Sequence, residues 1–136
     1  MKQKKKQVLV ESIVKLAHIY SLKKITSIIF LNYAPQLNQF LYWCQQLIAE
    51  SLGKKGRGIL PVVSPAPRDH HSLMQLYLDG PKDKLFYIFS INFKKKMKIN
   101  NNFFGKSFKF AENKDLSKVI FSQKKALTKV FKKKNI

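Results

Sequence analysis

The chain has 136 residues, of which 45% are hydrophobic and 12% aromatic, so it is long enough for one domain with a core and too apolar for a wholly disordered protein. No apolar run reaches the roughly 18 residues that a membrane-spanning helix needs. The apolar segment after the basic start is interrupted by polar side chains, unlike a signal peptide. We therefore expect a cytoplasmic protein without a membrane partner.

The net charge of +20 points first to nucleic acid or another polyanion. Among the 27 basic residues, however, only Arg57 and Arg68 are arginine, the side chain that makes bidentate contacts with phosphates and base edges. The lysines are spread over the whole chain, and we interpret them as a solvated surface rather than a nucleic-acid interface. A small basic nucleic-acid-binding protein is the alternative. The aromatic side chains that lie among lysines and could stack bases in such a protein are Phe103, Phe104, Phe108 and Phe110.

The first half of the chain shows helices alternating with a short strand. Residues 7–21 carry apolar side chains at helical spacing, and residues 26–31 form a β-favouring run that ends before Pro35. The clearest helix follows and ends at Gly53. Its predicted apolar stripe is Leu37, Phe40, Leu41, Cys44, Leu47 and Ile48.

The second half continues this alternation. Residues 59–63 predict a second strand, and a helix capped by Asp69 is expected to run to about Leu78. Residues 85–91 are a continuous apolar run, typical of a strand that is buried on both faces of a parallel sheet. Residues 94–114 predict a loop or an irregular hairpin, and a last helix follows from about Leu116.

Helices that alternate with short buried strands indicate the α/β class, here a three-layer α/β/α sandwich with a mostly parallel sheet. Residues 1–136 are expected to form a single domain. Ligands of such sheets bind beyond the carboxyl ends of the strands. We therefore expect the chemistry-bearing motifs in or beside the loops at that edge.

The first of these motifs contains Glu50, one of only seven acidic residues, at the C-terminal end of the strongest predicted helix. The partial negative charge of that end raises the proton affinity of a carboxylate, which suits a general base. A surface glutamate paired with Lys54 is the alternative. The glycine-rich residues 53–58 lack the spacing of a P-loop and lead into a strand, so a flexible basic turn is the role that remains for them.

The second motif contains the adjacent histidines His70 and His71 at the start of a predicted helix. The positive end of the helix dipole favours the neutral imidazole, which can take and return a proton near pH 7. Adjacent residues of a helix point about 100° apart, whereas metal-binding histidines prefer an i, i+4 spacing. We therefore expect no metal. A capping or hydrogen-bonding role is the alternative for each histidine.

Together the two motifs resemble those of phosphoglucose isomerases (glucose-6-phosphate isomerases). Residues 49–54, AESLGK, are similar to the family's Glu-Ser-x-Gly-Lys segment, and residues 69–81 are similar to its Gln-His motif with the following Gln-Leu helix and glycine. The order and the intervening short strand also agree. The resemblance places Glu50 on the family's proton-transferring glutamate and His71 on its ring-opening histidine. His70 stands where the family often has glutamine.

This resemblance implies an enzyme of glycolysis and gluconeogenesis that interconverts glucose 6-phosphate and fructose 6-phosphate without a cofactor. In the family the histidine reaches the active site from the neighbouring subunit, which implies a homodimer of the full-length protein. The family's phosphate-binding loops and an arginine precede the matched segment, and a catalytic lysine follows it. Residues 1–136 would therefore be part of the second sugar-isomerase (SIS) domain, inactive alone. A non-catalytic SIS domain that binds sugar phosphates is a further alternative.

Overall fold

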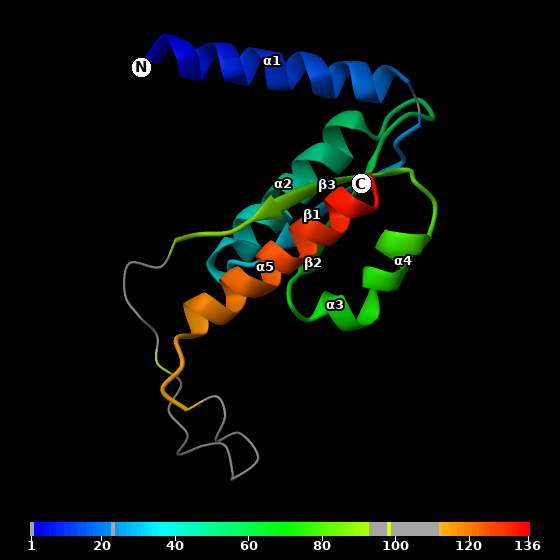
Figure 1. The fold of residues 1–136 in the computed structure, drawn as a ribbon. Coiled ribbons are helices and arrows are strands. Elements are labelled where there is room, and N and C mark those ends of the chain that lie inside the picture. Colours follow the sequence, from blue (N-terminus) through cyan, green and yellow to red (C-terminus); the bar gives the residue numbers. More distant parts are fainter. Residues whose placement is uncertain (1, 23, 93–97, 99–111) are drawn as a thin grey trace.

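The computed structural model describes residues 2–22, 24–92, 98 and 112–136 (Figure 1). The elements, in chain order, are α1 (Lys2–Ser21), β1 (Ser27–Asn32), the 3₁₀ turn η1 (Pro35–Leu37), α2 (Asn38–Leu52), β2 (Leu60–Pro65), α3 (Asp69–Ser72), α4 (Met74–Asp79), β3 (Lys84–Phe89) and α5 (Leu116–Lys133). The loop or hairpin expected over residues 94–114 lies almost wholly outside the described residues, and so do Phe103, Phe104, Phe108 and Phe110.

The described strands form one parallel sheet in the order β2-β1-β3. In its register Ile29 of β1 lies opposite Val62 of β2 and Phe86 of β3. The chain passes from β1 to β2 through α2, then returns past β1 to β3 through α3 and α4, so helices lie on both faces of the sheet (Figure 1). This confirms the predicted α/β class with a parallel sheet between layers of helices. The fold is small and incomplete.

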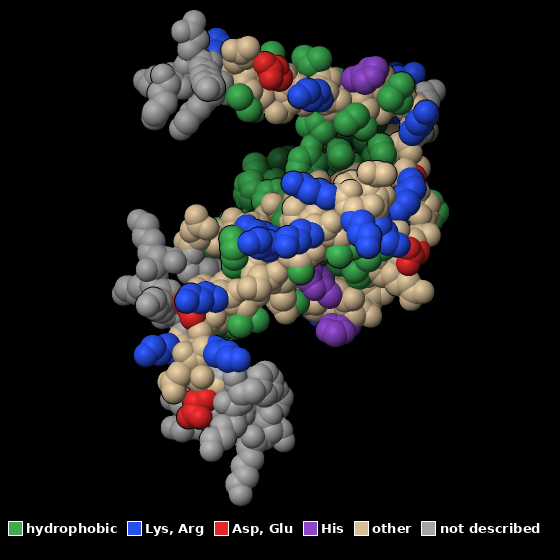
Figure 2. Space-filling model, viewed as in Figure 1, with side chains coloured by type: hydrophobic (Ala, Val, Ile, Leu, Met, Phe, Trp, Pro, Cys, Tyr) green, Lys and Arg blue, Asp and Glu red, His purple; other side chains and the backbone are tan. Residues whose placement is uncertain are grey.

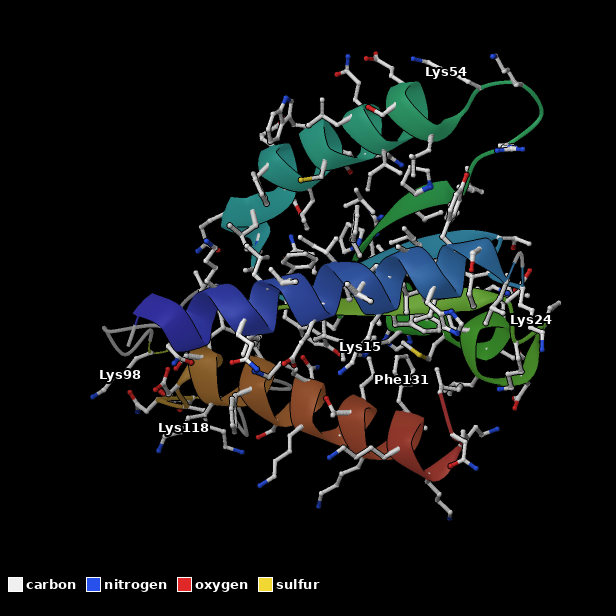
Figure 3. The ribbon with its side chains drawn as sticks, turned by 90° about the horizontal axis from the view of Figure 1, so that it is seen from above. Lys15, Lys24, Lys54, Lys98, Lys118 and Phe131 are labelled. Atoms are coloured by element: carbon white, nitrogen blue, oxygen red, sulfur yellow. The ribbon has the colours of Figure 1, made fainter. Side chains whose placement is uncertain are left out.

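One face of the sheet carries the core, which α4 and α5 cover. Side chains at alternate positions of β1 point to this face because successive residues of a strand face opposite ways. The ring of Phe131 on α5 lies 4.8 Å from the ring of Phe86 between centroids, and Tyr77 on α4 lies 5.3 Å from the same ring (Figure 3). The buried members of the cluster are Ile29, Leu31, Tyr33, Ala66, Met74, Tyr77, Leu127 and Phe131.

The opposite face is only partly filled. A hollow of about 480 Å³ lies between α1, α2 and the sheet, and its lining is almost entirely apolar. Figure 2 shows hydrophobic side chains in the space beneath α1. The predicted stripe of α2 is therefore only half covered: Leu41 is fully buried, whereas Phe40 and Leu47 are exposed. None of the described helices has the length and apolarity needed to cross a membrane.

The helix predicted from Asp69 to about Leu78 is divided, since α3 ends at Ser72 and α4 begins at Met74. The prediction that Asp69 caps it is wrong. The Asp69 carboxylate is buried and accepts a hydrogen bond of 2.9 Å from the Ser64 hydroxyl on β2, so the side chain binds the sheet instead of its own helix start. Gly53 ends α2 as predicted, and its N–H donates to the carbonyl of Ala49 at 2.9 Å.

Candidate functional site

His70 is held at the carboxyl edge of the sheet. Its Nε2 lies 2.7 Å from the hydroxyl of Tyr33, the residue that directly follows β1. The two rings meet edge to face, with centroids 5.6 Å apart. Tyr33 is itself fixed, because its backbone N–H donates to the carbonyl of Phe89 at the end of β3. The hydrogen-bonding alternative considered for the histidines thus describes His70.

The surroundings of this pair favour uncharged side chains. Burial raises the pKa of Tyr33 to about 12, so its hydroxyl keeps its proton at neutral pH. Burial lowers the pKa of His70 below its usual 6.5, and the neighbouring His71 lowers it further, while Asp69 acts in the opposite direction. Depending on the tautomer of His70, either the Tyr33 hydroxyl or the ring N–H donates in their hydrogen bond.

His71 is different, because its side chain is exposed and its ring makes no hydrogen bond within the described part of the chain. It projects from α3, whose preceding residues are anchored: Asp69 is bound to Ser64 and His70 to Tyr33. An exposed imidazole on an anchored segment can reach a group outside its own chain. Of the two histidines, the geometry leaves only His71 free for that purpose.

Glu50 lies in the last turn of α2 and is exposed to solvent. Its Oε1 accepts a hydrogen bond of 2.9 Å from Gln46 Nε2, one turn earlier. Among the described residues it forms no salt bridge, so the predicted alternative of a pair with Lys54 is not present. Figure 3 shows Lys54 just beyond the end of α2, on the side of the molecule away from α5.

A cleft of about 520 Å³ lies close to the loop after α2, at the amino edge of the sheet. The loop turns through left-handed backbone at Lys55 (φ 53°) and Gly56 (φ 70°). Arg57 lines the cleft and gives it a cation that could meet a phosphate. The sequence suggested a flexible basic turn here but not the cleft, which forms only where the loop meets the end of α1. Its lining residues are Tyr20, Ser21, Ile25, Thr26, Gly56, Arg57 and Gly58.

The structure does not bring Glu50 and His71 together. The strands are parallel, and α2 must return from the carboxyl end of β1 to the amino end of β2. Glu50, near the end of α2, therefore lies at the amino edge, whereas His71 follows β2 at the carboxyl edge. The expectation that both motifs lie at the carboxyl edge is wrong for Glu50, because the direction of the connecting helix decides its position.

The arrangement offers two separate chemical groups: an exposed carboxylate that can accept a proton and an exposed imidazole that can exchange one. Each is free of a charged partner among the described residues. In the same part of the chain, no three His, Cys, Asp or Glu side chains gather as they would around a metal ion.

Comparison with known proteins finds relatives for about half of the chain. It is 49% identical over 57 residues to a glucose-6-phosphate isomerase of Methanocaldococcus jannaschii, a match of 42% of this chain and 14% of the relative. It is 43% identical over 65 residues to the enzyme of the same name from Mycoplasmopsis synoviae, covering 48% and 15%. For that of Campylobacter jejuni it is 39% identical over 79 residues, covering 54% and 20%.

The matched segment thus spans no more than a fifth of these relatives. No family profile matches the chain. Among solved structures, a hypothetical protein from Thermus thermophilus superimposes with a TM-score of 0.70 at 23% identity, over 88% of this chain and 30% of that one. The fold therefore agrees with that of the Thermus thermophilus protein over a larger part of the chain than the segment that is similar in sequence to the isomerases.

Proposed function

We propose, from the glucose-6-phosphate isomerase family to which a segment of this chain is similar, that the chain supplies part of an active site that interconverts glucose 6-phosphate and fructose 6-phosphate. The observation that carries the proposal is the state of Glu50 and His71. The residues around both resemble the family's motifs, and both side chains are exposed and free of salt bridges in the part of the chain that is described.

In this reaction His71 would act first, on the cyclic sugar. Its imidazole exchanges a proton with the ring oxygen and the C1 hydroxyl, so that the C1–O5 bond breaks and the aldehyde forms. Glu50 then takes the proton from C2, which leaves a cis-enediolate with its charge on O1. As Glu50 returns that proton to C1, the proton of the C2 hydroxyl passes to O1 and the ketose forms. No electron leaves or enters the substrate, and therefore no redox cofactor takes part.

The positions of the two residues support a site shared between two chains. Glu50 and His71 lie at opposite edges of one sheet, so a single copy does not present them to one sugar. In a two-fold dimer, His71 of one protomer can reach the site that contains Glu50 of the other, twice by symmetry. We therefore extend the proposal to a homodimer of the complete enzyme, acting in sugar-phosphate metabolism in the cytoplasm.

Residues 1–136 would be part of the second SIS domain of such an enzyme. The chain spans a small fraction of the relatives, and the family's phosphate loops, arginine and lysine have no counterparts among its motifs. The basic loop beside the cleft, with Arg57, could assist a phosphate but does not replace those groups. The activity therefore belongs to the complete enzyme.

A chimera tests the proposal directly. Residues 27–92 of this chain replace the corresponding segment of the Methanocaldococcus jannaschii relative, and turnover of fructose 6-phosphate is measured. The chimera should be active, and Glu50→Gln should abolish turnover while the circular dichroism spectrum and the melting temperature stay unchanged. Near-normal turnover of the Glu50→Gln chimera would remove Glu50 from the mechanism.

A further inference from the structure

Tyr33 and His70 join parts of the chain that are 37 positions apart. The hydroxyl of Tyr33, at the end of β1, lies 2.7 Å from Nε2 of His70, at the start of α3. Tyr33 is 1% exposed and belongs to the core cluster, so its ring has little freedom to move. His70 therefore takes its position from the sheet.

The segment before His71 has a second anchor of the same kind. Ser64 of β2 donates to the buried carboxylate of Asp69, which also accepts from Arg68 Nε at 2.9 Å. α3 contains only the four residues Asp69–Ser72, too few for a helix that is stable by itself. Its orientation thus depends on its contacts with β1 and β2 rather than on its own hydrogen bonds.

We propose that Tyr33 is a positioning residue for His71: its hydrogen bond to His70 fixes the first turn of α3, and this holds in place the backbone from which the exposed His71 ring projects. Tyr33 does not take part in the chemistry. The positioning itself does not depend on the proposed function. Its purpose, to present His71 to a sugar bound by another copy of the chain, rests on that function.

Histidine NMR can test the positioning without any turnover, since the chain has only three histidines. The full chain is labelled with ¹⁵N- and ¹³C-histidine, and the resonances are assigned with His18→Gln and His71→Gln variants. In the wild type, His70 should show a single ring tautomer, fixed by the hydrogen bond between its Nε2 and the Tyr33 hydroxyl, and the backbone of His71 should show the restricted motion of an ordered turn. Tyr33→Phe should change the nitrogen shifts of His70 and increase the motion of His71.

Tyr87→Phe is the matched control, because this tyrosine lies half-buried on β3 against Phe30, and no hydrogen bond or ring contact joins it to a histidine in the described part of the chain. It should leave both histidines as in the wild type. Unchanged shifts and motion of His71 in a folded Tyr33→Phe chain would overturn the proposal. An equal change in the Tyr87→Phe chain would do so as well.

A second pair of variants decides the matter if Tyr33→Phe does not fold. His70→Gln keeps a side-chain group that can bond with the Tyr33 hydroxyl, and should preserve the order of His71. His70→Ala removes that group and should release His71. Equal order of His71 in the two variants would contradict the positioning role.

The chimera separates this inference from the proposed function. In the chimera, Tyr33→Phe should lower kcat for the cyclic sugar about fivefold, which is the effect expected for one hydrogen bond. The kcat for the open-chain substrate should not fall, and KM should change little. If His71 has no part in turnover, His71→Ala will leave the chimera active while the NMR result still stands. A loss of turnover without the NMR changes would instead contradict positioning and leave the catalytic role of His71 in place.

Discussion

Glu50 and His71 lie at opposite edges of the same parallel sheet, Glu50 at the end of the helix that returns to the amino edge and His71 just beyond the carboxyl end of β2. Their separation follows from the connectivity of the chain, since a helix that joins two parallel strands must run against them. The two groups that we propose to be catalytic, placed in this way, can serve one substrate only if two copies of the chain approach each other. This relationship leads to the following expectations.

The purified 136-residue chain should show no isomerase turnover. Its exposed Glu50 and His71 do not meet in one copy, and the cleft at the amino edge does not include Glu50 among its lining residues. A coupled assay that detects glucose 6-phosphate formed from fructose 6-phosphate checks this, with the chimera as the positive control. Measurable turnover by the isolated chain would show that it holds a complete site.

His71→Ala in the chimera should slow the reaction of cyclic glucose 6-phosphate more than that of an open-chain substrate. In the proposed mechanism the imidazole opens the ring, whereas the proton transfer between C2 and C1 depends on Glu50. Steady-state rates with the two kinds of substrate give the comparison. Equal losses with both would assign His71 a role outside ring opening.

His70 should make folding stability depend on pH in a narrow range. Its pKa is lowered by burial and by His71, so the folded chain binds the proton less readily than the unfolded chain, whose histidine titrates near 6.5. The stabilisation from the neutral ring is fully present above pH 6.5 and is lost as the pH falls through the lowered value of the folded state. Urea titrations from about pH 7 to about pH 5 should show this loss in the wild type.

His70→Gln should flatten that profile, because glutamine does not titrate. His18→Gln, at an exposed position of α1, should leave it unchanged. A wild-type profile without slope below pH 6.5, or the same slope in the His70→Gln chain, would contradict the account of His70.

The unequal filling of the two sheet faces should appear in stability. Leu127 is 6% exposed within the core beneath α5, and Leu127→Ala should lower the free energy of unfolding by about 2–5 kcal/mol. Leu9→Ala makes the same chemical change on α1, where the side chain is 60% exposed, and should cost less than about 0.5 kcal/mol. Equal losses in urea denaturation would mean that α1 packs as tightly as α5.

Apart from the division between α3 and α4, the strands and helices were predictable because each depends on a local pattern. The β-favouring run of β1, the helical spacing of α2 and its end at Gly53 all lie within short windows of the sequence. The contacts that shape the candidate site are not local. Tyr33 meets His70 across 37 positions, and Asp69 meets Ser64 only after β2 and α3 fold against each other, which withdraws Asp69 from the cap that its sequence position suggested.

The exposure of Phe40 and Leu47 could not be predicted either, because an apolar stripe does not show whether anything covers it. The position of Glu50 is a different case. The rule that connecting helices run antiparallel to their strands, applied to α2, would have placed it at the amino edge from the sequence alone. Whether Glu50 and His71 are the catalytic residues stays a prediction.

The most direct test of the shared site is complementation between two inactive chimeras, one carrying Glu50→Gln and the other His71→Ala. Subunits are dissociated, mixed in equal amounts and reassembled, so that about half of the dimers contain one of each. Each mixed dimer then has one site with both residues intact, and we predict that the mixture recovers about one quarter of the activity of the unmutated chimera. A mixture that stays inactive, although differently tagged subunits purify together, would contradict the proposal that Glu50 and His71 act across two chains.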